Sequence, residues 1–297
     1  MEQITSAILS NKPDLTDNSV KSYLSNIRRI YKNTAQAGID KINVNYFIDN
    51  KPNILKYLNE LKLGTRKTLL ASLVVLTDDE DYRTAMLTDI EKYTKEMNKN
   101  EKDQKQIKNW VSSSDIEKIY KQLKKEANAL YKKTNKTNDD LLKIQNYIII
   151  SLLGGIYIAP RRLLDYTEFK IKNVDKEKDN YLDIKQKQLV FNNYKTSKTY
   201  KEQRVDVPKP LLTILKKWIK INPTDYLLFD SLQSKLINVQ LTQYLNKIFG
   251  KKVSVNLLRH VYITEHMPSD LDTLDTMKAR ADNMGHGITM HLAYVKK

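Results

Sequence analysis

The sequence has 297 residues, which is long enough for two ordinary domains. Lysine and arginine number 51 against 35 aspartate and glutamate residues, and the resulting formal net charge of +16 favours a polyanionic partner. We expect nucleic acid first, ahead of an anionic membrane surface or an acidic protein. The absence of cysteine excludes disulfides, thiol catalysis and cysteine-ligated zinc.

Neither a secretory signal nor a membrane span is visible in the sequence. The first residues lack the basic start and the apolar core of a secretory signal. The longest apolar run, residues 147–159, is shorter than the ~18 residues that a membrane-spanning helix needs. We therefore expect this run to form a buried central helix, and we expect no membrane partner.

The first third of the chain has helical spacing. Apolar residues between Val20 and Tyr31 recur on one face of a helix, and Asp17-Asn18-Ser19 precedes them as a helix start. Further helices are expected at 52–62, 65–76 and 80–98. The pattern predicts a small helical domain.

A charged stretch follows this domain. Residues 95–110 contain almost no apolar side chain, which is typical of a linker. Ser114 and Glu117 then stand at the spacing of a capping box, which predicts the start of an amphipathic helix. We place the domain boundary near residue 108, which gives domains 1–108 and 109–297.

The second domain changes pattern once. After the buried helix, β-rich segments are expected at 167–171, 180–196 and 203–208. In the last of these, Val205 and Val207 alternate with polar neighbours, as in a half-exposed strand. From Pro208 onward helical spacing returns. The sequence therefore predicts a mostly α fold with one small β-sheet, in which a helical domain precedes an α+β domain.

Two stretches contain arginines in apolar surroundings. In "YIAPRRLLDY", Arg161 and Arg162 follow the apolar helix, and Asp165 could form an (i, i+3) ion pair with Arg162 at a helix start. In "VNLLRHVYITEH", Arg259 lies among apolar residues, so its guanidinium needs a carboxylate or phosphate partner. Each arginine alone fits a structural salt bridge as well as a binding role.

Two further stretches carry residues that can react. In "NNYKTSKTYKEQRVD", Lys195, Lys198 and Lys201 lie at the expected tip of a hairpin, where they either protect a sheet edge or reach a DNA groove. In "MGHGITMHLAYVKK", His286 follows a glycine at a helix boundary and Tyr294 comes further along. Taken alone, this last stretch is an ordinary terminal helix in which Tyr294 packs.

Together these residue types fit metal-free phosphoryl transfer. A tyrosine hydroxyl can attack a phosphodiester and form a covalent intermediate. Arginine guanidinium groups stabilise the negative charge on the nonbridging oxygens, where other enzymes use a magnesium ion. A lysine ammonium can protonate the leaving 5′-oxygen. The sequence thus indicates strand cleavage in a nucleic acid, with neither cofactor nor metal.

The order of these residues resembles the tyrosine recombinase/integrase family, whose catalytic set is Arg, Lys, His/Lys-x-x-Arg, His/Trp and Tyr. Arg162 with Asp165 resembles the family's R-x-x-E/D turn, and Arg259-His260 resembles its second motif. "MGH" resembles the family's "LGH", and Tyr294 stands where the nucleophile is expected. The likeness covers about residues 110–297, while residues 1–105 resemble the helical core-binding domain in length and pattern alone.

Three features depart from the family pattern. Asn256 stands where the family's first histidine of the second motif is expected, and an amide can donate a hydrogen bond but cannot move a proton. The catalytic lysine is either Lys195 or Lys198, of which we favour Lys195. Only Val295, Lys296 and Lys297 follow the tyrosine, whereas many relatives dock a longer segment into the next protomer, so the subunit contact stays unidentified.

The resemblance implies a role for each of these residues. It implies catalysis by Arg162, Lys195 or Lys198, Arg259, His286 and Tyr294, support by Asp165, Asn256 and His260, and DNA contact by Arg161 and Lys201.

The resemblance also implies a function. We expect a site-specific recombinase or integrase that acts on double-stranded DNA as a homo-tetramer through 3′-phosphotyrosyl intermediates, inside the cell, in the cytoplasm or nucleus. "APRRLLDY", "NNYKTSKTY" and "MGH" resemble the mobile-element and large-DNA-virus branch. The alternatives are a type IB topoisomerase and a non-catalytic DNA-binding protein that retains the fold. A role at a membrane surface or on RNA fits the charge but explains none of the motifs.

Overall fold

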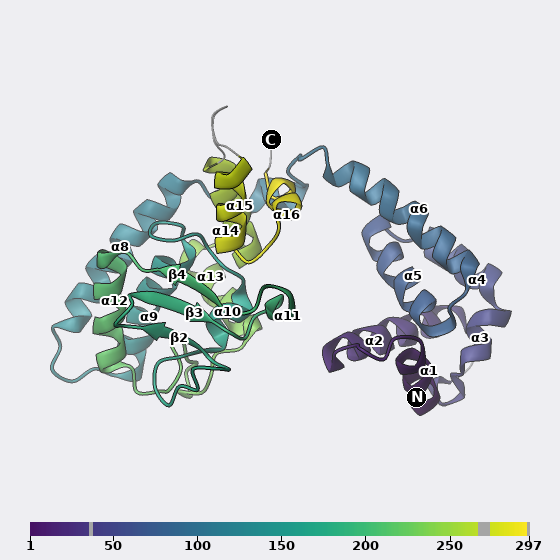
Figure 1. The fold of residues 1–297 in the computed structure, drawn as a ribbon, viewed down its shortest axis with the longest axis horizontal. Helices are drawn as coiled ribbons and strands as arrows, with labels where there is room; N and C mark the ends of the chain where they lie inside the picture. The colour runs from purple at the N-terminus through teal and green to yellow at the C-terminus, as the bar shows by residue number, and fades with distance from the viewer. Residues whose placement is uncertain (36–37, 267–273, 296–297) are drawn as a thin grey trace. The chain divides into compact units, whose positions relative to one another are not determined.

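The structure is a computed structural model that describes residues 1–35, 38–266 and 274–295 (Figure 1). The chain forms two compact units, Met1–Lys99 and Asn100–Lys297. The division between them lies inside the charged stretch 95–110, which also contains the short helix α7 (Gln104–Asn109). Among the described residues no helix is long and apolar enough to cross a membrane.

The first unit is helical throughout its described residues. Its elements are α1 (Glu2–Asn11), α2 (Asp17–Thr34), the 3₁₀ turn η1 (Ile39–Lys41), α3 (Val44–Asp49), α4 (Lys51–Asn59), α5 (Leu63–Thr77) and α6 (Glu80–Met97). Helices α2, α4, α5 and α6 confirm the four helices predicted in this part of the chain, while α1 and α3 were not predicted. Helix α5 packs against α1, α2 and α6, and its Leu69, Leu73 and Leu76 are buried in the core of the unit.

The second unit combines helices with one small sheet. Besides α7, its elements are α8 (Ser113–Tyr131), α9 (Asn138–Leu153), α10 (Leu163–Thr167), β1 (Phe169–Lys170), β2 (Asn180–Asp183), β3 (Gln188–Phe191), α11 (Ser197–Tyr200), β4 (Gln203–Asp206), α12 (Lys209–Ile221), α13 (Asn238–Phe249), α14 (Val255–Glu265), α15 (Leu274–Asn283) and α16 (Ile288–Ala293). The chain is thus mostly helical with a small sheet, as the sequence predicted.

Two helix starts differ from the prediction. The capping box of α8 is formed by Ser112 and Asp115, whose side chains each accept the other's backbone N–H at 3.1 Å, and not by Ser114 and Glu117. The predicted pair was wrong because Ser112 and Asp115 satisfy the same spacing one half-turn earlier. The buried helix α9 likewise starts earlier than expected, at a capping box that Thr137 begins.

The predicted buried helix also ends early. Helix α9 stops at Leu153, so residues 154–159 of the apolar run are not helical. Gly155 adopts a φ of +73°, and a Cβ there would lie 2.6 Å from the ring of Tyr262. A glycine in the left-handed region ends the helix and lets the α14 ring approach the backbone. This turn directs the chain toward Pro160 and the two arginines.

The sheet has the order β1-β2-β3-β4, with β1 parallel to β2 and the other pairs antiparallel. The three predicted β segments are confirmed, although the first is reduced to two residues and the second folds back on itself between β2 and β3. Leu189 of β3 pairs with Val205 of β4, which points inward as the alternation predicted. The loop between β3 and β4 contains all three predicted lysines.

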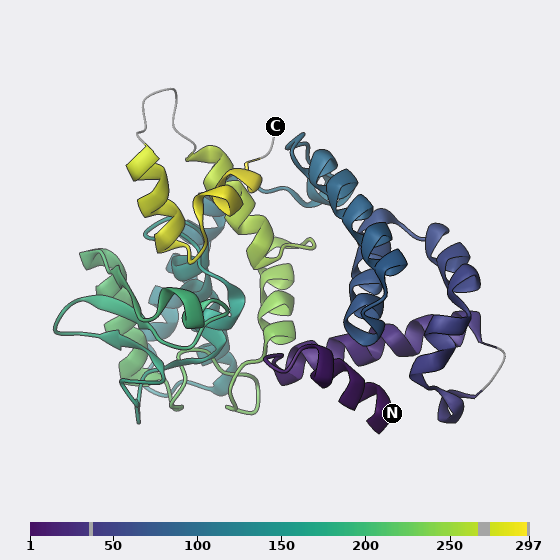
Figure 2. The ribbon, with the colours of Figure 1, turned by 45° about the vertical axis from the view of Figure 1, so that its right-hand side comes forward.

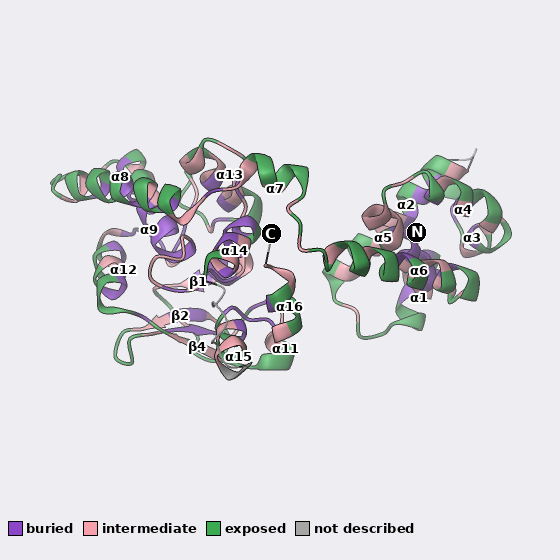
Figure 3. Cartoon of the chain, turned by 90° about the horizontal axis from the view of Figure 1, so that it is seen from above, coloured by how far each residue is buried: buried purple, intermediate pink, exposed green. Residues whose placement is uncertain are grey.

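The core of the second unit surrounds α9. Figure 3 shows buried residues along α9, α14 and the strands, while the outer faces of α8 and α12 are exposed. Trp218 of α12 stacks on Phe229 with ring centroids 5.8 Å apart. The C-terminal helices α15 and α16 lie side by side in Figures 1 and 2, and α15 also packs against β4. The end of α15 is thereby held next to the residues that follow α9.

Candidate active site

The C-terminal turn of α15 is the centre of the site. Gly285 has a φ of +68°, its amide donates to the carbonyl of Asp282 at 2.8 Å, and the next amide returns to the helix at 3.1 Å. This is the Schellman arrangement, in which a glycine in the left-handed region follows a helix. A Cβ at Gly285 would lie 3.1 Å from Nη2 of Arg161 and 3.4 Å from Nη1 of Arg162. Glycine is required here for the backbone angle and for the approach of two arginines.

Three arginines donate to successive backbone carbonyls of this turn. The pairs are Arg161 Nη1 with Asn283 at 3.0 Å, Arg259 Nη1 with Met284 at 3.2 Å, and Arg162 Nη1 with Gly285. The last carbonyls of a helix have no partner within the helix and form its negative end, so positive groups are stabilising there. The end of α15 therefore gathers guanidinium groups from two distant segments of the chain.

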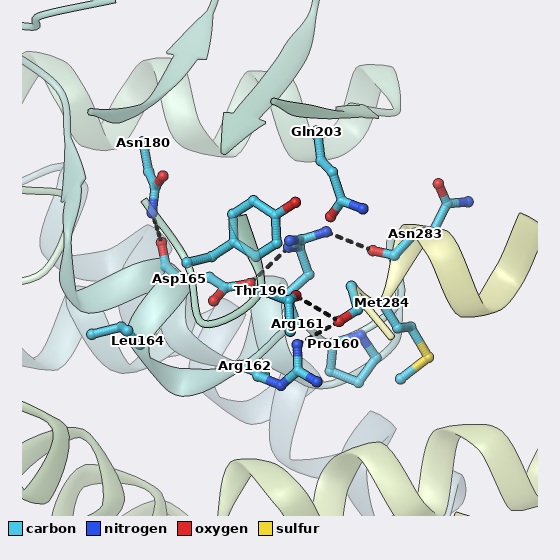
Figure 4. Close-up of polar contacts among 12 residues, drawn as sticks. Pro160, Arg161, Arg162, Leu164, Asp165, Asn180, Thr196, Gln203, Asn283 and Met284 are labelled. Carbon is cyan, nitrogen blue, oxygen red and sulfur yellow. Dashed lines mark hydrogen bonds and ion pairs between the residues drawn. The ribbon is translucent and has the colours of Figure 1, made fainter. Parts of the chain in front are cut away.

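Arg161 is fully buried (Figure 4). Its Nε donates to Asp165 at 2.8 Å, and its guanidinium lies 4.2 Å from the ring centroid of Phe191 and 5.1 Å from that of Tyr194. Asp165 thus pairs with Arg161 and not with Arg162 as predicted, because Arg161, which precedes α10, packs against Phe191 with its guanidinium next to this carboxylate. The DNA contact of Arg161 stays a prediction, and its Nη2 is a buried donor without a hydrogen-bond partner among the described residues.

Arg162 is half-buried and points to the other side of the turn (Figure 4). It shares the carbonyl of Gly285 with the hydroxyl of Thr196, which donates at 3.3 Å. Burial, and to a lesser degree the nearby charge of Arg162, lowers the pKa of Arg259. Two guanidinium groups held this close repel each other, and an anion between them relieves that repulsion.

Arg259 of α14 is fully buried, and its donors meet groups that the sequence did not predict. Besides Met284, its Nη1 donates to the carbonyl of Pro160 at 3.3 Å, and its Nη2 lies 2.6 Å from Nδ1 of His286. Its Nε has no hydrogen-bond partner among the described residues. Among the described residues its hydrogen-bond partners thus include no carboxylate, and one buried N–H donor is left without a partner there.

His286 is buried and uncharged at neutral pH. Burial, followed by the positive charge of Arg259, lowers the pKa of His286 to about 3. Its Nε2 lies 3.1 Å from Nδ1 of His291, which is also buried. The sequence reasoning did not single out His291, although two of only four histidines in the chain fall in this one short stretch. That clustering of a rare residue was the available signal.

Tyr294 stacks with two imidazole rings next to Arg259. Its ring centroid is 4.4 Å from that of His260 and 5.3 Å from that of His286, with interplanar angles of 30° and 23°. The guanidinium carbon of Arg259 lies 5.1 Å from the centroid of the Tyr294 ring. Nδ1 of His260 also lies 2.9 Å from the carbonyl oxygen of Tyr294. Ring stacking and the cation–π contact hold the phenol beside the buried arginine.

The hairpin loop carries its lysines to the edge of this site. Lys195 and Lys198 are exposed, and Lys201 follows α11 with a φ of +55°. The Thr196 hydroxyl bonds Gly285, so the loop touches the turn that gathers the arginines. Within the described part of the chain, neither Lys195 nor Lys198 forms an ion pair with a carboxylate. Both ammonium groups are therefore available to a ligand, and the geometry does not decide between them.

The remaining predicted residues lie at different places. Asn256 is exposed on the first turn of α14, one turn before Arg259, and His260 is half-buried against Tyr294. Lys296 and Lys297 lie outside the described residues. Within the part of the chain that the structure describes, no group of three histidine, aspartate or glutamate side chains is arranged to hold a metal ion.

Comparison with solved structures identifies the fold. A lambda integrase tetramer bound to a Holliday junction matches with a TM-score of 0.55 and 13% identity, over 99% of this chain and 76% of that chain. A lambda integrase dimer bound to a COC′ core site matches with a TM-score of 0.53 and 14% identity, over 97% of this chain and 74% of that chain. XerA recombinase matches with a TM-score of 0.44 and 15% identity, over 100% of this chain and 94% of that chain. The chain has an integrase-like fold.

This fold confirms the architecture that the motifs predicted. The structural neighbours are tyrosine recombinases, and they match over nearly the whole chain. No protein-family model matches the sequence, and no curated protein matches it either. At this low identity the integrase-like fold shows which elements correspond, and the roles of individual residues rest on the geometry described above.

Replacing Arg161 tests the buried ion pair. We expect Arg161→Met to lower the free energy of unfolding by about 3–5 kcal/mol, because it leaves the Asp165 carboxylate buried without a partner. Arg204→Met, which removes a surface pair with Glu202, should cost at most about 1 kcal/mol. Denaturant unfolding of both variants checks this. Equal losses would show that the buried pair does not stabilise the fold.

The low pKa of His286 makes stability depend on pH. Its pKa is about 3 in the folded chain and about 6.5 when unfolded. Below pH 6.5 the unfolded chain therefore binds a proton that the folded chain does not. The stabilisation is complete above pH 6.5 and is lost as the pH falls, by up to about 1.4 kcal/mol per pH unit.

We expect His286→Gln to make this slope shallower between about pH 5 and 6.5. His291, whose pKa is also lowered by burial, continues to contribute in that variant. His266→Gln, which changes an exposed histidine, should leave the slope at the wild-type value. Chemical denaturation at several pH values gives the three slopes. An unchanged slope for His286→Gln would show that this ring is protonated in the folded chain.

Proposed function

We propose that this chain cleaves and rejoins strands of double-stranded DNA, with Tyr294 as the nucleophile and without a metal ion. The observation that carries the proposal is the position of the Tyr294 ring, 5.1 Å from the guanidinium carbon of Arg259 and stacked on His286. Arg259 is fully buried and has an N–H group without a partner among the described residues. A phosphate oxygen is a suitable acceptor for that donor, and the phenol is then close to the phosphorus.

The charge of the site supports a phosphate ligand. Arg161, Arg162 and Arg259 meet at the end of α15, and Asp165 is the carboxylate that pairs with one of them. His286, which is hydrogen-bonded to Arg259, and His291, which is hydrogen-bonded to His286, both have lowered pKa values, so they do not add charge at neutral pH. The excess of fixed positive charge in a buried site favours a bound anion, and it stabilises charge that develops during reaction.

The proposed reaction proceeds in two balanced steps. The Tyr294 oxygen attacks the phosphorus and releases its proton to water, a 3′-phosphotyrosyl bond forms, and the bond from phosphorus to the 5′-oxygen breaks. Arg162 and Arg259 stabilise the nonbridging oxygens, and the Lys195 ammonium protonates the leaving 5′-oxygen. Attack by a 5′-hydroxyl then reverses the step and releases Tyr294. His286 donates a further hydrogen bond to the phosphate.

The partners follow from the same proposal. Lambda integrase has been solved as a dimer on a core site and as a tetramer on a Holliday junction. We propose that this chain likewise binds two DNA sites as a homo-tetramer and exchanges strands between them, as a recombinase or integrase. The helical domain 1–108 supplies a second DNA-binding surface besides that of the catalytic domain. The net charge of +16 favours binding of the DNA backbone by both surfaces.

Changing Tyr294 tests the proposal directly. Wild-type protein incubated with a nicked candidate site should give a covalent protein–DNA band on a denaturing gel, in the presence of EDTA. Tyr294→Phe should give no such band and should bind the DNA within about twofold, since its ring and its stacking partners remain. Tyr200→Phe, at an exposed tyrosine on the neighbouring hairpin loop, should retain the band.

The outcomes of this experiment separate the alternatives. A wild-type protein that binds DNA but forms no band is a non-catalytic DNA-binding protein. A band accompanied by relaxation of supercoiled DNA, without recombination between two sites, indicates a type IB topoisomerase. A band that persists in Tyr294→Phe contradicts the assignment of the nucleophile.

The two candidate lysines are distinguished by the leaving group. Lys195→Ala should slow adduct formation about 100-fold or more if Lys195 protonates the 5′-oxygen, whereas Lys198→Ala should cost less than about tenfold. A substrate with sulfur in place of that 5′-oxygen needs no proton donor, so it should restore Lys195→Ala to nearly the wild-type rate. Single-turnover rates with both substrates provide the comparison. If the sulfur-substituted substrate restores the single-turnover rate of Lys198→Ala and not that of Lys195→Ala, the proton donor is Lys198.

A further inference from the structure

Both ring nitrogens of His286 form hydrogen bonds within the chain. Nδ1 lies 2.6 Å from Nη2 of Arg259, and Nε2 lies 3.1 Å from Nδ1 of His291. A neutral imidazole has one donor and one acceptor, so both are used. In this arrangement His286 has no N–H left to offer to a phosphate.

The directions of these two bonds follow from chemistry. A guanidinium group has donors only, so Nδ1 of His286 must accept from Arg259 and the proton of His286 must be on Nε2. That proton points to Nδ1 of His291, which must then accept it. His291 consequently carries its own proton on Nε2. A chain of donors therefore runs in one direction, from Arg259 through His286 to His291.

His291 connects this chain to the helix that carries the tyrosine. His291 lies in α16 and is buried, and its backbone carbonyl accepts the backbone N–H of Tyr294 at 3.1 Å. The rings of His286 and His291 are tilted by 57° with centroids 5.3 Å apart, which suits an edge-directed hydrogen bond and not a stack. Among the groups that face His286, Arg161, Arg162 and Arg259 are positive, and their charges oppose a second proton on the His286 ring.

We propose that His291 is a positioning residue that fixes the orientation of the His286 ring and occupies its Nε2–H donor until a phosphate oxygen replaces it. The second half of this inference rests on the function proposed above. Before DNA binds, His291 keeps a buried N–H satisfied and fixes the ring orientation that stacks on Tyr294. When DNA binds, a phosphate oxygen replaces His291 as the acceptor of the hydrogen bond from Nε2–H, because a charged acceptor forms a stronger hydrogen bond than a neutral imidazole nitrogen. His286 is then already in the tautomer that the phosphate requires.

Two substitutions of His291 separate this role from simple packing. Asparagine places its Oδ1 as far from Cβ as histidine places Nδ1, so His291→Asn keeps an acceptor for His286. His291→Leu keeps apolar volume but removes the acceptor. Met290→Ala, at an exposed residue on the same helix, is the matched control.

The first readout needs neither DNA nor activity. Long-range ¹H–¹⁵N NMR of the ring nitrogens at pH 7 should show His286 with a protonated Nε2 and an unprotonated Nδ1 in the wild type, in His291→Asn and in Met290→Ala. In His291→Leu the Nε2–H loses its acceptor while Arg259 still donates to Nδ1, so we expect the Nε2 signal to shift and Nδ1 to stay unprotonated. Unchanged His286 signals in His291→Leu would overturn the assignment of His291 as the acceptor of the Nε2–H of His286.

The second readout is the rate of covalent adduct formation. His291→Leu should be about tenfold slower than wild type, which corresponds to the loss of one orienting hydrogen bond, and His291→Asn should recover to within about threefold. DNA affinity should be unchanged in all variants. Equal rates for His291→Leu and His291→Asn would overturn the positioning role in the reaction. If the wild type forms no adduct, the proposed function and the phosphate exchange both fail, and the NMR result alone decides whether His291 accepts the Nε2–H of His286.

Discussion

The carbonyls at the end of α15 that have no hydrogen-bond partner within the helix are the constraint on which the site depends. A helix terminates with backbone acceptors that need donors, and here the donors are three arginine side chains at Asn283, Met284 and Gly285. The acceptors offset part of the cost of burying guanidinium groups, and they fix where each group points. Without this helix end, like charges would repel one another inside the core. The turn at Gly285 therefore makes the positive site stable before any ligand arrives.

The same concentration of positive charge determines the state of the histidines. Burial and the neighbouring arginine keep His286 neutral, so it acts as a hydrogen-bond donor of fixed tautomer and not as a charge. Neutral rings also stack more readily on the phenol of Tyr294 beside the guanidinium of Arg259. Charge stabilisation is thus supplied by groups that stay charged at all relevant pH values. Division of labour of this kind suits phosphate chemistry in a buried site.

Much of this fold could be predicted from the sequence, because helical spacing and strand alternation are local signals. Helices α2, α4, α5 and α6 of the first unit and the strand with Val205 were found in this way, whereas α1 and α3 were not. The partner of Asp165 was not, because (i, i+3) and (i, i+4) spacings both offered an arginine and packing against Phe191 decided between them. The role of the α15 carbonyls could not be predicted either, because every residue has a backbone carbonyl and the residue type does not show which carbonyls accept hydrogen bonds. His291 was missed because its contact depends on the turn at Gly285, which precedes α16, and on the ring tautomer of its neighbour.

The central claim is that Tyr294, gathered with buried arginines, forms a covalent bond to DNA. Peptide mapping tests it most directly. Tryptic cleavage after Arg280 and Lys296 gives the peptide 281–296, in which Tyr294 is the only tyrosine. After reaction with a cleavable DNA site and nuclease digestion, mass spectrometry should find a nucleotide on that peptide, with fragmentation placing it on Tyr294. A nucleotide on any other residue, or on none while DNA is bound, would contradict this account.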